Sequence, residues 1–97
     1  MIVHIVMFQF KDENKEQNIA KTKDLLNALV NKIDELISLE VGVNFDTAER
    51  AYDLSLYSKF ASKEDLNSYA VHSEHLKVVE FIKTVVQGSK VVDYIVE

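Results

Sequence analysis

Three observations predict that this chain of 97 residues folds as one small α+β domain. Segments 2–10 and 52–60 have the patterns of β-strands, and segments 16–38 and 62–87 carry apolar residues at helical spacing. All predicted elements follow the order β-α-β-β-α-β, without a linker or a repeat. This is the order of the ferredoxin-like arrangement, in which two helices cover one face of a four-stranded antiparallel sheet. A chain of this length forms a single domain with a modest core.

The first predicted strand is apolar at nearly every position from Ile2 to Phe10. Such a run is typical of a strand that is covered on both faces. One face carries His4, Val6, Phe8 and Phe10, and the other carries Val3, Ile5, Met7 and Gln9. From about Glu16 to Ser38 the apolar residues recur every three or four positions, which predicts one long amphipathic helix.

Two further strands are predicted in the middle of the chain. Residues 39–45 alternate, with Val41, Val43 and Phe45 on one side. Gly42 inside this strand indicates a bulge or a close approach of another part of the chain. Residues 52–60 alternate most clearly, and their apolar face carries Tyr52, Leu54, Leu56 and Phe60.

The second predicted helix begins at Ser62, whose hydroxyl can cap free backbone amides and is followed by acidic residues. We expect a kink or a short break near His72 and Ser73. The helix then continues to Gly88, a residue type that commonly follows a helix end. Residues 91–96 form the last predicted strand.

The charge of the chain excludes some classes of partner. The net charge is -5, and the eleven Lys and Arg residues are scattered. A nucleic-acid partner is not expected, because phosphate binding needs a basic stripe. A membrane partner is not expected either, since a negative chain suits anionic lipid poorly. No segment approaches the roughly 20 apolar residues of a membrane helix.

The absence of cysteine excludes disulfides, thiolate catalysis and zinc–thiolate sites. The first residues lack both the basic segment and the long apolar run of a signal peptide. A cytoplasmic location is therefore the expectation.

The apolar second face of the first strand predicts a homodimer. Two helices can cover only one face of the sheet, yet Val3, Ile5 and Met7 point to the other face. Leaving them in water would forgo about 1.5–3 kcal/mol per large side chain. A second copy, packed sheet to sheet so that the two sheets make one barrel, would cover them. A bent first strand is the alternative.

The three histidines and one tyrosine are the candidate functional groups. His4 lies on the first strand, and His75 shares an apolar helical stripe. A break near Ser73 would let Tyr69 and His75 converge on one cavity whose floor includes His4. An imidazole titrates near neutrality and can exchange a proton with a nearby hydroxyl. Such a group could remove a proton next to a carbonyl or polarise that carbonyl.

Two other interpretations of these residues remain open. Buried histidines and tyrosines often only satisfy backbone groups. His72 and His75 could also form a metal pair, but a divalent ion would need a third ligand from His4 or a carboxylate. We expect neither a metal nor a cofactor, and two glycines in the chain cannot supply a phosphate loop.

Five passages together resemble the stress-responsive A/B-barrel (Dabb) family of the dimeric α+β barrel superfamily. They are HIVMFQF (4–10), EVGVN (40–44), RAYDL (50–54), YAVHSEH (69–75) and VVDY (91–94). The resemblance spans essentially the whole chain, as a single domain 1–97, and implies the ferredoxin-like fold and a dimeric barrel. Ser73 departs from the proline of many members, which leaves the kink less rigidly set.

The resemblance also implies roles for individual residues. Family members are associated with stress in plants, and one plant member is an enzyme that aldol-cyclises a polyketide-derived thioester. By this likeness His75 would be the acid/base, Tyr69 its partner and His4 a substrate-orienting group. The implied ligand pocket, between sheet and helices, is lined by Val6, Phe8, Leu56, His72 and Asp93.

Two hypotheses about function follow. The first is a dimeric protein that binds a small apolar or carbonyl-containing molecule. The second is a cofactor-independent cyclase, lyase or isomerase that acts through His4, Tyr69 and His75. The fold alone does not choose between them.

Overall fold

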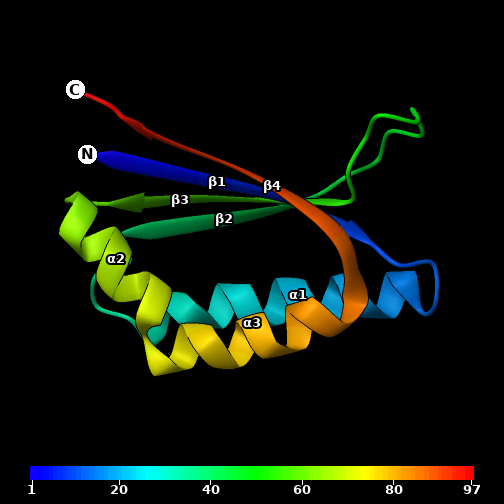
Figure 1. Ribbon diagram of the computed structural model, residues 1–97, viewed down its shortest axis with the longest axis horizontal. Helices are drawn as coiled ribbons and strands as arrows, with labels where there is room; N and C mark the ends of the chain where they lie inside the picture. Colours follow the sequence, from blue (N-terminus) through cyan, green and yellow to red (C-terminus); the bar gives the residue numbers. More distant parts are fainter.

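Four antiparallel strands form one layer of the molecule, and all the helices lie on one face of that layer (Figure 1). The structure is a computed structural model that describes every residue from Met1 to Glu97. Its elements are β1 (Ile2–Phe10), α1 (Lys15–Ala28), the 3₁₀ turn η1 (Leu29–Asn31), β2 (Ser38–Val43), β3 (Leu54–Phe60), α2 (Lys63–Val71), α3 (Ser73–Val85) and β4 (Val86–Ile95). The strand order β2-β3-β1-β4 confirms the predicted ferredoxin-like sheet. No helix combines the length and the apolar character that crossing a bilayer requires.

The hydrophobic core lies between the sheet and the helices. Alternate residues of β1 and β3 supply one side of it, and the helices and the segment after η1 supply the other. The most completely buried core side chains are Phe10, Leu26, Leu29, Ile33, Leu54, Phe60 and Tyr69. Because side chains alternate across a strand, this core places His4 of β1 on the helix-facing side, where the sequence predicted it.

The opposite face of the sheet is only partly exposed. Met7 is 42% exposed there, as are Val92 (52%) and Tyr94 (42%) of β4. Val3, which was expected to need a partner's cover, is already 1% exposed within the single chain. It lies between its cross-strand neighbours Lys59 and Tyr94, whose long side chains flank it. The exposed apolar area on this face therefore centres on β4 more than on β1.

The long first helix predicted for residues 16–38 is wrong in its second half. The α-helix ends at Ala28, η1 follows, and Ser38 already belongs to β2. Ile33 and Leu36 are buried although neither is helical. Apolar residues recur at helical spacing beyond Ala28 because the connection to β2 packs against the same core. In this segment the spacing therefore indicates burial and does not indicate a helix.

The predicted role of Gly88 is also wrong. Helix α3 ends at Val85, and β4 begins at the next residue. Gly88 lies inside β4 and pairs with Gln9, beside a shift of register that leaves Gln87 as the extra residue. The strand starts early because β1 extends far enough to pair with it, so no glycine is needed to end the helix.

Gly42 shows one of its two predicted features. It pairs with Ser55 in an unbroken register, so the predicted bulge is absent. The close approach is present, because a Cβ atom at this position would lie 3.2 Å from the Ser55 hydroxyl oxygen.

Candidate functional site

The predicted break between the two C-terminal helices is present, and it is built without proline. The side-chain oxygen of Ser62 accepts a hydrogen bond from the Asp65 amide at 3.1 Å and starts α2, as expected. At His72 the backbone is extended, with φ -64° and ψ 137°. The imidazole Nδ1 of His72 accepts a hydrogen bond from the Glu74 amide at 3.1 Å and so caps α3.

The break brings Tyr69 and His75 into contact. Their ring centroids lie 4.3 Å apart, and the Tyr69 ring also lies 4.9 Å from that of Phe60. His4 lies 6.4 Å from both the Tyr69 and the Phe60 rings, in edge-on geometry. Three elements, β1, α2 and α3, therefore carry one cluster of two imidazoles around a buried phenol.

His4 is oriented by an aspartate on the neighbouring strand. His4 and Asp93 are direct cross-strand partners of β1 and β4, and His4 Nδ1 is hydrogen-bonded to the Asp93 carboxylate. Because a carboxylate accepts, Nδ1 carries the proton of this bond. The remaining ring nitrogen, Nε2, is left for another group.

His75 is held in a different environment. Its Nδ1 donates a hydrogen bond to the Ala70 carbonyl at 3.0 Å, so Nε2 is the free acceptor of the neutral ring. Burial lowers the pKa of His75 below its ordinary value of 6.5, against the opposing effect of the Ala70 carbonyl. The nearby rings of His4 and His72 lower it further. The neutral imidazole of His75 is therefore favoured over the charged one.

Tyr69 lies between the two imidazoles with its hydroxyl unpaired. Its side chain is 1% exposed, and the hydroxyl has no hydrogen-bond partner in the protein. Burial raises the pKa of Tyr69 to about 12, so the hydroxyl keeps its proton. An unpaired buried hydroxyl costs about 1–3 kcal/mol. An acceptor oxygen on a bound molecule would remove this cost.

The other pocket residues implied by the resemblance do not all meet in one place. Phe8 and Leu56 are buried members of the core, and Val6 packs against it. His72 lies at the helix break, where its ring caps α3. Asp93 alone of the five borders one of the three largest pockets.

The pocket beside Asp93 has a volume of about 280 Å³ and lies between α2 and the adjoining ends of β1 and β4. It is lined by Ile2, Lys63, Leu66, Asn67, Asp93, Tyr94 and Ile95. Lys63 and Asn67 were missed by sequence reasoning. Their four-residue spacing, which places them on one face of a helix, was the only available signal.

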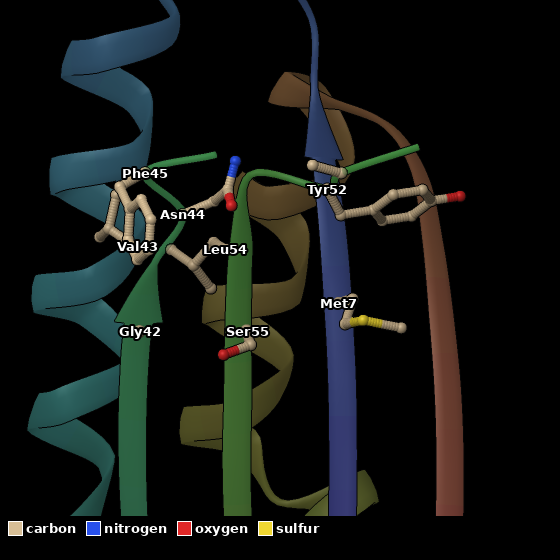
Figure 2. Close-up of a pocket in the computed structure, with 9 residues that line it drawn as sticks. Met7, Gly42, Val43, Asn44, Phe45, Tyr52, Leu54 and Ser55 are labelled. Carbon is tan, nitrogen blue, oxygen red and sulfur yellow. The ribbon is translucent and has the colours of Figure 1, made fainter. Parts of the chain in front are cut away.

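The largest pocket, of about 320 Å³, lies away from the histidines (Figure 2). It is an open hollow at the β2–β3 hairpin end of the sheet. In the view of Figure 2 the helices lie behind the sheet, so Met7 and Ser55 project from the face that the helices leave uncovered. No imidazole or carboxylate lines this hollow. Its chemistry is that of an apolar contact surface.

The structure offers no assembled metal centre. No three His, Asp or Glu side chains are placed to hold one ion. The Nδ1 atoms of His72 and His75 are both engaged with the backbone, on the two sides of the helix break.

Comparisons with known proteins agree with this architecture. A family model described as Stress responsive A/B Barrel Domain matches residues 2–96. The stress-response A/B barrel domain-containing protein DABB1 of Arabidopsis thaliana is 28% identical over the whole of this chain, which spans 48% of that protein's length. The crystal structure of a dimeric ferredoxin-like protein of unknown function from Bacteroides fragilis is 31% identical, with a TM-score of 0.88 over 96% of this chain and 93% of that one. The hydroxynitrile lyase from Passiflora edulis is 20% identical, with a TM-score of 0.87 over 99% of this chain and 93% of the lyase. The chain belongs to the stress responsive A/B barrel domain family.

Proposed function

We propose that this protein binds a small carbonyl-containing molecule at the cluster of His4, Tyr69 and His75. The observation that carries the proposal is the buried Tyr69 hydroxyl, which is a donor without an acceptor. A carbonyl oxygen is an acceptor of suitable size for such a place. The Nδ1 atoms of both neighbouring imidazoles are already engaged, so their Nε2 atoms remain for the ligand.

The pocket beside Asp93 lies next to this cluster. Asp93 borders the pocket and is bonded to His4, so one side chain separates the pocket from the first member of the site. Ile2, Leu66 and Ile95 give it an apolar lining that would hold the hydrocarbon part of a ligand. Its volume of about 280 Å³ suits a small molecule.

A thermal-shift screen with small aldehydes, ketones and thioesters tests the proposal. We expect Tyr69→Phe, which removes only the hydroxyl, to lose the stabilisation given by each carbonyl ligand. Its unliganded melting temperature should stay equal or rise, because an unpaired polar group is removed. Tyr57→Phe is the matched control, since Tyr57 belongs to the opposite face of the sheet. Equal ligand shifts in wild type and Tyr69→Phe would rule the site out.

A second candidate function is acid/base catalysis without a cofactor, as in a lyase, cyclase or isomerase. One observation favours it: the two imidazoles occupy different environments. Burial lowers the pKa of His75, while Nδ1 of His4 is hydrogen-bonded to the Asp93 carboxylate. His75 would then remove a proton beside the carbonyl, Tyr69 would hold the carbonyl oxygen, and His4 would orient the substrate. The Passiflora edulis lyase shows that this fold can carry a lyase, at an identity that indicates likeness of fold alone.

We also propose that the protein forms a homodimer through the face of the sheet that the helices leave uncovered. Met7, Val92 and Tyr94 expose apolar area there, and the open hollow at the hairpin end continues the same face. The similar Bacteroides fragilis protein is dimeric. Covering such side chains contributes about 25 cal/mol per Å² of apolar area.

Val92→Asp is expected to convert the dimer to a monomer. The carboxylate would lie in the apolar centre of the interface, where an unpaired charge is costly. Multi-angle light scattering at micromolar concentration measures the mass directly. Val71→Asp is the control, because Val71 is 72% exposed on α2 and lies outside the sheet. Wild type that runs as a monomer, or a Val92→Asp variant that stays dimeric, would contradict the assignment.

A further inference from the structure

The carbonyl of Ala70 has an unusual partner at the helix break. In a continuous helix this carbonyl would accept a hydrogen bond from the amide four residues later, that of Glu74. Here the Glu74 amide donates to the His72 ring at 3.1 Å, and the Ala70 carbonyl accepts from His75 Nδ1 at 3.0 Å. The Glu74 amide and the Ala70 carbonyl have therefore each replaced a helical hydrogen-bond partner with a histidine ring. These two bonds lie where α2 ends and α3 starts, and one of them holds the His75 ring.

These two bonds place the neighbouring histidines in opposite tautomers. A carbonyl can only accept, so Nδ1 of His75 carries the proton and Nε2 presents a lone pair. A backbone amide can only donate, so Nδ1 of His72 is the bare nitrogen and its proton is on Nε2. The hydrogen bond made by one ring nitrogen fixes the state of the other.

The break also decides whether Tyr69 and His75 can meet. Six residues apart on a continuous helix, they would be separated by about 120° around the axis and would lie on different faces. In the structure their rings are 4.3 Å apart. No proline or glycine lies between residues 69 and 75 to force the interruption. The side-chain cap at His72 is the interaction that replaces the missing helical bond.

We propose that His72 is a positioning residue, which sets the Nδ1–H tautomer of His75 by capping α3 and releasing the Ala70 carbonyl. His75 Nε2 then keeps a free lone pair on a ring that lies 4.3 Å from that of Tyr69. The use of that lone pair rests on the proposed function, but the tautomer itself does not. A protein that shows the predicted tautomers and binds no carbonyl ligand would therefore refute the proposed function and leave this proposal standing.

Long-range ¹H–¹⁵N correlation spectra of the imidazoles at pH 7.5 test the proposal. Wild type should show His75 as Nδ1–H and His72 as Nε2–H. In His72→Ala the Glu74 amide loses its side-chain acceptor, so His75 should lose the single-tautomer pattern and give averaged shifts. In His72→Asn the amide oxygen restores a cap of the kind that helix starts prefer, and His75 should return to Nδ1–H.

Ser62→Ala is the matched control, because it removes the equivalent cap of α2 without touching Ala70. It should lower stability as His72→Ala does and leave the His75 shifts unchanged. Wild-type His75 in the Nε2–H form would overturn the proposal, and so would a folded His72→Ala that keeps Nδ1–H. Should His72→Ala fail to fold, His72→Asn decides alone: a folded Asn variant with averaged His75 shifts overturns it as well.

Discussion

Replacing Phe60 with alanine is expected to lower the free energy of unfolding by about 3–5 kcal/mol. Phe60 is fully buried at the end of β3, and its ring lies 4.9 Å from that of Tyr69 and 6.4 Å from that of His4. The alanine variant loses the transfer free energy of the ring and leaves a cavity where the sheet meets α2. A domain of this size is stable by only about 5–15 kcal/mol, so the variant would be close to unfolding. Urea denaturation followed by circular dichroism measures the change.

Val71→Ala is the control for this prediction. Val71 is 72% exposed on α2 and lies outside the sheet, so its truncation should change the free energy by less than about 0.5 kcal/mol. Both variants and wild type are compared at equal protein concentration, because subunit association would couple stability to concentration. A Phe60→Ala change below about 1 kcal/mol would show that the aromatic cluster is loosely packed.

The fold was predictable because alternation and element order are local properties of the sequence. The alternating apolar residues of β3 specified its core face, and the Ser62 cap specified the start of α2. Element ends were less predictable, since they depend on neighbours distant in the chain. β4 starts at Val86 because that residue pairs with β1. Ile33 is buried because the connection that carries it packs against the core.

The clustering of His4, Tyr69 and His75 was predictable, but the hydrogen bonds of these residues were not. A break near His72 and Ser73 was expected, and such a break lets Tyr69 and His75, six residues apart, come into contact. The His75 bond to the Ala70 carbonyl could not be predicted, because it requires that the Glu74 amide find another acceptor. The spacing of residue types along the sequence does not indicate which backbone carbonyl a side chain will bind.

The rate of proton exchange beside a bound carbonyl is expected to fall by about 10²–10⁴-fold in His75→Asn, the range that general acid–base catalysis contributes. The substitution suits the test because the asparagine amide can still donate to the Ala70 carbonyl, as His75 Nδ1 does, while the basic nitrogen is lost. A ketone identified by thermal shift is incubated with the protein in D₂O. Loss of its α-proton signal by NMR gives the rate.

The pH dependence of the same exchange identifies the base. As the proposed base His75 would act in its neutral form, and burial lowers its pKa below 6.5. More acid is therefore needed to protonate it than to protonate an ordinary histidine, so the rate should be flat from pH 8 to about pH 6.5 and decline only below that. Tyr57→Phe, altered on the opposite face of the sheet, should follow the wild-type curve. A decline that begins above pH 7 would mean that a group with a raised pKa is the base, and an unchanged rate in His75→Asn would leave this protein a binder without acid/base chemistry at His75.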